Sequence, residues 1–175
     1  MTGKLWTVIV VLAGITSVPA RTQSADMRVA PPVSAVASAK AYWAGISVAD
    51  AKASAKWYQQ KLHFYIYKTM DLPEHHLKIV FLDLNGFSLE LIQFAGAMSF
   101  EVVKKRVPEL TDRDRLLGFV KLGFQIAEVD ALAAELKRDG TKLLMEPTED
   151  REFHDRFLML QDPDGNVLQF FQKLK

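Results

Sequence analysis

The chain has 175 residues, no cysteine, and 22 basic against 21 acidic residues, which leave a net charge of +1. Without cysteine it has no disulfide, no thiolate metal ligand and no cysteine nucleophile. Because the chain has almost no excess of positive charge, we expect neither nucleic acid nor an anionic membrane as a partner.

The first residues have the pattern of a bacterial export signal. Lys4 is followed by an apolar run at residues 5–15, and Val18-Pro19-Ala20 ends in a small residue suited to cleavage. The run is shorter than the roughly 20 apolar residues that a spanning helix needs. We predict a signal peptide at residues 1–20, cleaved after Ala20 or alternatively after Ala25, and a periplasmic or secreted chain that is free of the membrane. An uncleaved membrane anchor is the alternative.

Residues 21–40 are predicted to be a linker or a disordered arm. They are rich in alanine, proline, serine and valine, contain Pro31-Pro32, and show no helical or strand period in their second half. The folded domain is therefore expected at residues 41–175. A chain of that size buries roughly two-thirds of its surface, which is enough for a core without disulfides.

The first part of this domain is predicted to be a βαβββ unit at residues 41–94. Alternating apolar residues at 44, 46 and 48 indicate a strand, and Asp50 suits the N-cap of a helix at residues 51–62. His63 would then take a left-handed position after the helix. Three strands follow at residues 64–70, 77–84 and 87–94, the last two joined by the turn residues Asn85-Gly86.

A second βαβββ unit is predicted at residues 119–173, after a connector at residues 95–118. The connector holds a short helix within residues 99–107, ended by Pro108, and a charge cluster at residues 111–115 to which we assign no site. The unit itself has a strand at 119–126, a helix at 130–139 stopped by Gly140, and strands at 142–146, 156–161 and 167–172.

The two units repeat one another in sequence. The turn Asp162-Pro163-Asp164-Gly165-Asn166 joins two apolar runs, as proline, glycine and short polar residues do in hairpins. Asp83, Asn85, Gly86 and Leu89 match residues of this second hairpin 79 positions later (165 − 86). The fold class is therefore α+β, with two tandem βαβββ units.

The chain resembles the vicinal oxygen chelate superfamily, which contains glyoxalase I, bleomycin-resistance proteins, fosfomycin-resistance enzymes and extradiol dioxygenases. The resemblance covers roughly residues 42–172. It implies a glyoxalase-like half-open barrel around a cleft, which a second copy of the chain completes in some relatives, so a homodimer is one expectation. It also implies a divalent metal, held by one residue on the first and one on the fourth strand of each unit. The segments that carry the resemblance are residues 45–50, residues 57–64, Leu89-Glu90-Leu91 and the turn at residues 162–166.

In this chain the four positions that hold the metal in the family correspond to Trp43, Glu90, Lys121 and Gln169. An indole cannot bind a metal ion, and an ammonium repels one. We therefore expect a degenerate metal site and no cofactor. The ammonium of Lys121 would take the place of the metal and face Glu90 and Gln169, either as an ion pair that fills the site, which we favour, or as an anion-binding or proton-handling group.

Strand alternation predicts an apolar wall around these polar positions. Trp43, Val80, Phe157, Met159 and Phe171 should share a face with Glu90, Lys121 and Gln169. Such a face suits a small, partly apolar organic ligand. We therefore predict a ligand site made by Trp43, Glu90, Lys121, Phe157, Met159 and Gln169.

No catalytic residue is assigned from the sequence. His75 and His76 stand side by side in a loop, His154 precedes a strand near the expected cleft, and Ser47 and Ser88 have no histidine and carboxylate beside them in the pattern. Two functions stay open. One is a metal-free protein that binds a small organic molecule. The other is a glyoxalase-like lyase or isomerase that works with a metal through Glu90 or without one through Lys121.

Overall fold

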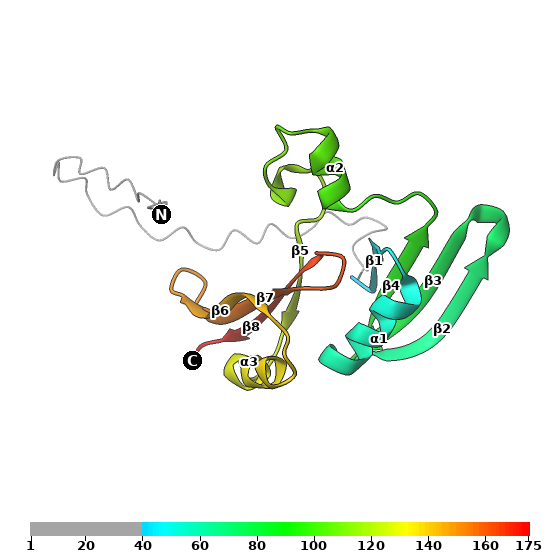
Figure 1. The fold of residues 1–175 in the computed structure, drawn as a ribbon. Coiled ribbons are helices and arrows are strands. Elements are labelled where there is room, and N and C mark those ends of the chain that lie inside the picture. Colours follow the sequence, from blue (N-terminus) through cyan, green and yellow to red (C-terminus); the bar gives the residue numbers. More distant parts are fainter. Residues whose placement is uncertain (1–39) are drawn as a thin grey trace, which may run out of the picture. The chain divides into compact units, whose positions relative to one another are not determined.

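Two βαβββ units follow one another in the computed structural model, which describes residues 40–175 (Figure 1). This order confirms the α+β fold and the duplication predicted from the repeated turn. The first unit consists of β1 (Trp43–Ser47), α1 (Ala51–Leu62), β2 (Tyr65–Leu72), β3 (Leu77–Leu84) and β4 (Phe87–Phe94). The second consists of β5 (Lys121–Gln125), α3 (Val129–Arg138), β6 (Leu143–Asp150), β7 (Asp155–Gln161) and β8 (Val167–Lys173).

The predicted signal peptide, at residues 1–20, lies outside the described residues, as does the predicted arm up to residue 39. Among the helices that are described, none combines the length and the apolar character that crossing a bilayer requires.

Each unit forms its own four-stranded sheet. The strand orders are β1-β4-β3-β2, which we call sheet A, and β5-β8-β7-β6, which we call sheet B. The first strand of each unit pairs in parallel with the fourth, and the other pairs are antiparallel. No strand pairing joins the two sheets in residues 40–175, so β1 and β5 each keep one free edge and the barrel is open, as expected.

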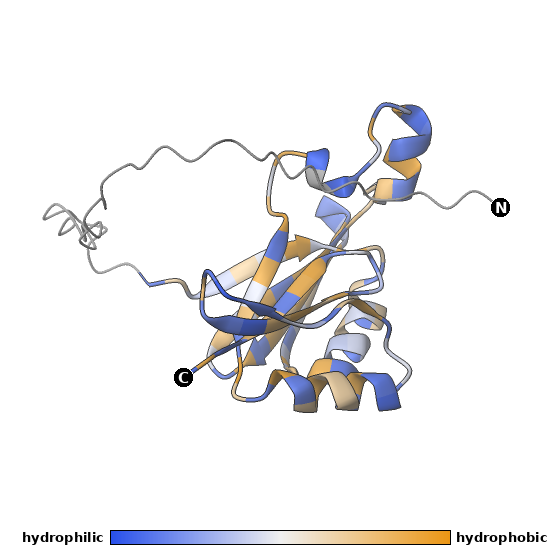
Figure 2. Ribbon diagram, turned by 90° about the vertical axis from the view of Figure 1, so that its left-hand side faces the viewer, coloured by the Kyte–Doolittle hydropathy of each residue, from blue (hydrophilic) through white to orange (hydrophobic). Residues whose placement is uncertain are grey.

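The alternation of the strands places one face of each sheet in a shared core. Apolar residues alternate with hydrophilic ones along the strands (Figure 2). The inward residues pack against apolar residues of α1 and α3, and together they form one cluster that draws on both units. Its largest fully buried side chains are Tyr58, Phe64, Leu82, Leu89, Leu91, Leu136, Leu158, Leu160 and Leu168.

Helix α1 begins and ends as its sequence predicts. One carboxylate oxygen of Asp50 accepts hydrogen bonds from the backbone N–H groups of Lys52 and Ala53 at 2.9 and 3.0 Å, which caps the helix. His63 follows the last turn with a left-handed φ of 56°. That position is confirmed, and it lets the imidazole Nε2 meet Glu135 Oε1 of α3 at 2.6 Å.

Phe124 of β5 joins the two units in the core. Its ring lies 6.0 Å from Phe64, 5.5 Å from Phe87 and 5.3 Å from Phe170, measured between ring centroids. The first two contacts are edge-to-face and the third is stacked, the arrangements that aromatic rings prefer. Phe64 and Phe87 belong to the first unit, so the two sheets share a core although their strands do not pair.

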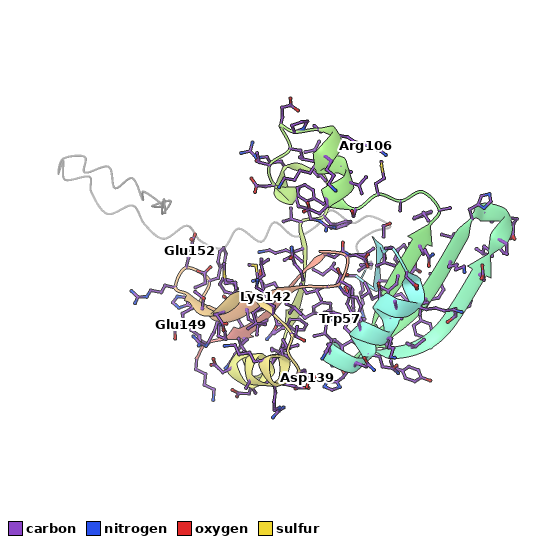
Figure 3. All side chains as sticks on the ribbon, in the orientation of Figure 1. Trp57, Arg106, Asp139, Lys142, Glu149 and Glu152 are labelled. Atoms are coloured by element: carbon purple, nitrogen blue, oxygen red, sulfur yellow. The ribbon has the colours of Figure 1, made fainter. Side chains whose placement is uncertain are left out.

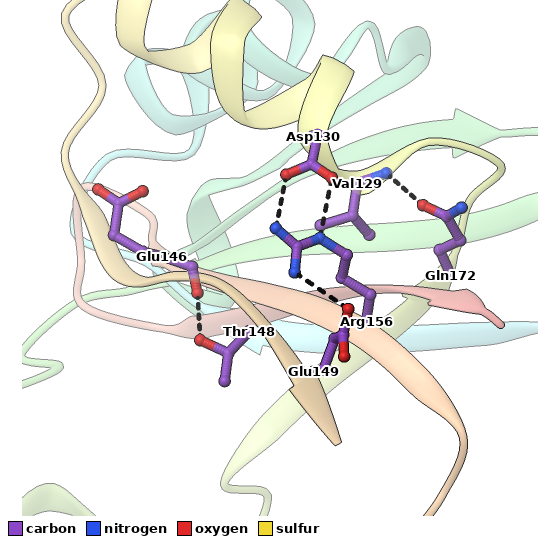
Figure 4. A network of polar contacts seen from close by, with 7 residues as sticks. All are labelled: Val129, Asp130, Glu146, Thr148, Glu149, Arg156 and Gln172. Carbon is purple, nitrogen blue, oxygen red and sulfur yellow. Dashed lines mark hydrogen bonds and ion pairs between the residues drawn. The ribbon is translucent and has the colours of Figure 1, made fainter. Parts of the chain in front are cut away.

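The second unit has a polar network on its surface, where α3 meets β7 (Figure 4). Two guanidinium nitrogens of Arg156 donate to the two carboxylate oxygens of Asp130, both at 2.8 Å. The guanidinium lies 4.0 Å from Glu149, and Gln172 accepts from the backbone N–H of Val129. The hydrogen bond from Arg156 lowers the pKa of Asp130. The network holds the start of α3 on sheet B.

The connector between the units contains α2 (Phe100–Arg106) and the short 3-10 helix η3 (Arg113–Arg115), and Figure 3 shows Arg106 on α2. Ser99 takes the N-cap position of α2, and its side-chain oxygen accepts from the backbone N–H of Val102, so the predicted short helix is confirmed.

Strand β6 reaches Asp150, farther than residues 142–146 predicted, although Pro147 lies within it. It is an edge strand with a register shift between Met145 and Thr148, and both features tolerate a proline.

Candidate functional site

Trp43 and Glu90 lie on the open face of sheet A, which is the face turned away from its helix. In the parallel ladder of β1 and β4, Trp43 is opposite Ser88 and Gly45 is opposite Glu90. A methyl group added to Gly45 would lie 3.8 Å from Glu90 Oε2 and 3.8 Å from Trp43 Cζ3. The two predicted ligand residues therefore come together over Gly45, where the tight neighbour of an added methyl group would be Ile92 Cδ1 at 3.1 Å.

The other four predicted residues lie on the open face of sheet B. Gly123 is opposite Gln169 in the ladder of β5 and β8, and Lys121 stands two positions before Gly123, on the same face. Gln169 is opposite Met159 on β7, and Phe157 is two positions before Met159. Strand alternation therefore places Lys121, Phe157, Met159 and Gln169 on one sheet face, as the sequence predicted.

One residue was assigned to the wrong face. Val80 was expected beside Glu90, but it is only 3% exposed and stands opposite Leu91 in the core. Phe81 takes the expected place, directly opposite Glu90. The error is a shift of one residue, which moves a strand side chain to the other face of its sheet.

The predicted ion pair between Lys121 and Glu90 is also wrong. Within residues 40–175, neither a salt bridge nor a hydrogen bond links the Lys121 ammonium to Glu90 or to Gln169. Glu90 lies on β4 over Gly45, whereas Lys121 is exposed at the first residue of β5. The two residues belong to different sheets, and the sequence could not show how far apart those sheets hold them.

Lys121 lines a cavity of about 300 Å³ that we call the small cavity. Four parts of the chain form its walls. They are residues 44–49 in and after β1, residues 97–100 and Arg113 of the connector, residues 119–122 at the start of β5, and Asp164, Asn166 and Val167 of the last hairpin. Apolar side chains dominate this lining, among them Ile46, Met98, Phe100, Phe119 and Leu122. A concave, mainly apolar space with a few charged groups is typical of ligand sites.

A wider depression of about 780 Å³ adjoins the small cavity, because the two share several lining residues. Shared residues include Lys121, Arg113 and Phe100, whereas Met159 and Gln161 line the depression alone. The two cationic side chains therefore stand where both spaces meet. Of the predicted ligand residues, Lys121 and Met159 line this region, and Trp43, Glu90, Phe157 and Gln169 line neither space.

Arg113 is the functional candidate that the sequence analysis missed. It lies in the charge cluster at residues 111–115, to which no site was assigned, and yet its side chain is half-buried. Its guanidinium donates to the backbone oxygen of Asp164 at 3.1 Å and to Asn166 Oδ1 at 2.7 Å. No signal in the sequence separates Arg113 from its charged neighbours, because both partners lie about fifty residues away in the chain.

The turn at residues 162–166 holds this wall of the cavity in place. Asp162, only 5% exposed, accepts hydrogen bonds from Tyr58, from the backbone N–H groups of Asp164 and Asn166, and from the Asn166 amide. Burial, together with the charge of Asp162, raises the pKa of Tyr58 far above its usual range, so the hydroxyl stays protonated and donates. Asp164 accepts from Ala49 N and Ser54 Oγ, which ties the turn to the start of α1.

The residues present do not fit the metal that the resemblance implies. No group of three or more histidine, aspartate or glutamate side chains in residues 40–175 is placed to hold a metal ion. Of the four family positions, Glu90 supplies a good oxygen donor and Gln169 a weak one, while Trp43 supplies none and the ammonium of Lys121 repels a cation. We therefore derive no chemistry through a metal.

Residues 40–170 match the Glyoxalase/Bleomycin resistance protein/Dioxygenase superfamily. No match was found among curated proteins.

Solved structures share the fold. The chain is similar to a mutant of glyoxalase I from Zea mays, with 21% identity and a TM-score of 0.61 over 78% of this chain and 45% of that chain. It is similar to a glyoxalase family protein from Enterococcus faecalis, with 19% identity and a TM-score of 0.63 over 75% of this chain and 96% of that one. It is also similar to a glyoxylase/bleomycin resistance protein/dioxygenase domain from Frankia sp. EAN1pec, with 18% identity and a TM-score of 0.62 over 79% of this chain and 93% of that one. The chain thus spans less than half of the maize chain.

Proposed function

This chain belongs to the glyoxalase/bleomycin resistance protein/dioxygenase superfamily, and we propose that it binds a small organic acid without a metal. The observation that carries the proposal is the placement of Lys121 and Arg113 at the boundary of an apolar cavity of about 300 Å³. The acidic group of the ligand would lie between these two cations. Its apolar body would lie against residues such as Phe100 and Leu122 in the small cavity, or against Met159 in the depression beside it.

Both cations are available to a ligand. No described carboxylate lies within salt-bridge distance of Lys121 or Arg113. Arg113 uses two of its nitrogens in hydrogen bonds to the last hairpin, and a guanidinium has five N–H donors. A carboxylate therefore gains two charge-assisted partners, one of them already held in position by the turn.

The proposal favours binding over catalysis. None of the four histidines lines the small cavity or the depression, and His63 is engaged with Glu135 on the helical side of the molecule. The metal positions of the family hold Trp43 and Lys121, which supports a degenerate metal site. A glyoxalase-like lyase or isomerase stays the alternative function, through Glu90 with a metal or through Lys121 without one.

The experiment compares organic acids with their neutral amides. We expect aromatic and branched aliphatic carboxylic acids to raise the melting temperature of the chain and to bind in calorimetry, while the matching amides bind more weakly. Loss of one charge-assisted contact corresponds to about a tenfold change in affinity, and we expect that change for Lys121→Ala. Lys56→Ala, which removes an exposed lysine from α1, is the matched control.

Two results would contradict the proposal. If the acids and their amides bind equally well, the cations do not select the ligand. If no acid in the series binds and Lys121→Ala changes nothing, the small cavity is not a ligand site and the chain serves another purpose.

Export and self-association belong to the same proposal. The signal pattern at residues 1–20 supports a periplasmic or secreted chain, and the family supports a homodimer. Expression of the full chain in a bacterium tests the first, because the exported form should begin at Arg21, or at Asp26 if cleavage follows Ala25. Sedimentation tests the second. A full-length chain retained in the cytosol, or a monomer at high concentration, would contradict the respective part.

A further inference from the structure

A group of aromatic and polar side chains on the open face of sheet A is separate from the small cavity. Trp43, Tyr67, Phe81, Ser88 and Glu90 form this group, which we call the aromatic patch. None of the five lines the small cavity or the depression beside it. Trp43 is 59% exposed and Tyr67 48%, whereas Phe81 and Glu90 are half-buried.

A β-bulge in β2 directs two side chains at Phe81. Ile66 pairs with Leu82 and Lys68 pairs with Phe81, so Tyr67 is the extra residue of the bulge. A bulge lets two neighbouring residues oppose one residue of the partner strand. The ring of Tyr67 accordingly lies 5.9 Å from the ring of Phe81, and the ammonium of Lys68 lies over the same Phe81 ring, 5.6 Å from its centroid.

Contacts connect the members of the patch around Glu90. The hydroxyl groups of Tyr67 and Ser88 are 2.7 Å apart, and Ser88 stands opposite Trp43 in the ladder of β1 and β4. Glu90 stands opposite Phe81 on one side and Gly45 on the other, where Trp43 Cζ3 and the Glu90 carboxylate approach the same point. Glu90 therefore has Phe81 and Trp43 as neighbours on this face, and Tyr67 joins the group through its contacts with Phe81 and Ser88.

The electrostatics of the patch favour a cation. No described residue donates a hydrogen bond to the Glu90 side chain or forms an ion pair with it. The faces of aromatic rings carry partial negative charge and attract ammonium groups. The ammonium of Lys68, which lies over the Phe81 ring, shows that one of these ring faces attracts a cation within the chain itself.

We propose that the aromatic patch is a binding site for an organic ammonium ion, with Glu90 supplying the charge and Trp43, Tyr67 and Phe81 the ring faces. A methylated ammonium suits the patch because its methyl groups contact the rings and it sheds water more easily than a bare ammonium. The ligand charge is opposite to that expected at Lys121 and Arg113, so the site adds a second ligand class to the proposed acid-binding function and does not depend on it.

The test uses choline and its neutral isostere, 3,3-dimethyl-1-butanol, as probes. Binding is followed by NMR through the indole N–H resonance of Trp43, assigned with the variant Trp43→Phe. We expect choline to shift this resonance in a saturable way and the neutral alcohol to bind at least about fivefold more weakly. Glu90→Gln should weaken choline binding about tenfold, whereas Glu109→Gln, at an exposed glutamate of the connector, should leave it unchanged.

Lys68 provides a second and more specific test. Since its ammonium already occupies the Phe81 ring face, Lys68→Met should tighten choline binding about two- to threefold, while Lys56→Met should not. Circular dichroism shows whether each variant is folded. Equal binding of choline and its neutral isostere would overturn the proposal, and so would an unchanged choline affinity in folded Glu90→Gln. A weaker affinity in Lys68→Met would place any cation away from Phe81 and overturn the assigned position.

Discussion

The hydrogen bond between Tyr58 and Asp162 links the first unit to the last hairpin, and we expect its removal to be among the most damaging changes in the chain. Tyr58 is 0% exposed and donates to Asp162 Oδ2 at 2.9 Å. Asp162→Ala removes this acceptor and also those of two backbone N–H groups and of the Asn166 amide. The amide can turn to water because Asn166 is half-buried, whereas the Tyr58 hydroxyl cannot.

The magnitude follows from these contacts. A hydrogen bond to a charged group contributes about 1.5–3 kcal/mol, and a buried donor without a partner costs about 1–3 kcal/mol. We therefore expect Asp162→Ala to lower the free energy of unfolding by about 3–5 kcal/mol. Tyr58→Phe removes the hydroxyl itself, so no buried donor is left without a partner, and Asp162 keeps its other hydrogen-bond donors. We therefore expect Tyr58→Phe to lower the free energy of unfolding by about 1–2 kcal/mol.

Urea unfolding of both single variants and of the double variant measures the coupling between the two groups. The double variant should be less unstable than the sum of the single changes, by at least about 1 kcal/mol. Asp139→Ala is the matched control, because its side chain is 44% exposed and its one ion pair among the described residues is with Lys61, so we expect less than about 1 kcal/mol. Additive effects of the two single changes would refute the reasoning, since they would mean that Tyr58 and Asp162 do not interact in solution.

Three further predictions concern protonation, Lys121 and metal ions. The pKa of Tyr58 is raised above its ordinary value of 10.0 in the folded chain, so the unfolded chain loses the hydroxyl proton at a lower pH than the folded chain. The free energy of unfolding should therefore fall by about 1.4 kcal/mol for each pH unit above 10.0. Urea unfolding at about pH 9 and about pH 11 should show this fall in the unmodified chain, and Tyr58→Phe should lack it. An identical fall in the unmodified chain and in Tyr58→Phe would contradict the assignment of the pH dependence to Tyr58. Lys121→Met should change the free energy of unfolding by less than about 0.5 kcal/mol, because Lys121 is exposed and unpaired among the described residues. A loss of several kcal/mol, measured by urea unfolding, would show that Lys121 forms an ion pair. Zn²⁺, Ni²⁺, Mn²⁺ and Fe²⁺ should bind no more tightly than to a surface carboxylate in calorimetry, whereas a stoichiometric metal that is lost in Glu90→Ala would support the lyase or isomerase alternative.

Local chemistry explains why so much of the fold could be predicted. The left-handed φ values at Asn85, Gly86 and Gly165 follow from turn residues that accept them, and Asp50 caps α1 with its own side chain. Each of these features depends on residues a few positions apart. The repeated turn then indicated the duplication, and the duplication indicated the fold.

The faces of the strands were predicted less well, because alternation depends on register. The residues of sheet B were assigned to the correct face from the sequence, whereas Val80 and Phe81 were exchanged in sheet A. The bulge that brings Tyr67 and Lys68 to Phe81 gives no signal in the sequence, since it arises from how β2 pairs with β3.

The sequence by itself therefore determined the two βαβββ units, their turns and caps, and the residue types at the positions that hold a metal in the family. The tertiary structure alone decided which of these side chains meet. It placed Glu90 with Trp43 over Gly45, and Lys121 with Arg113 beside the last hairpin. Contacts between residues far apart in the chain depend on how two sheets pack through a shared core, and no local pattern of residues records that packing.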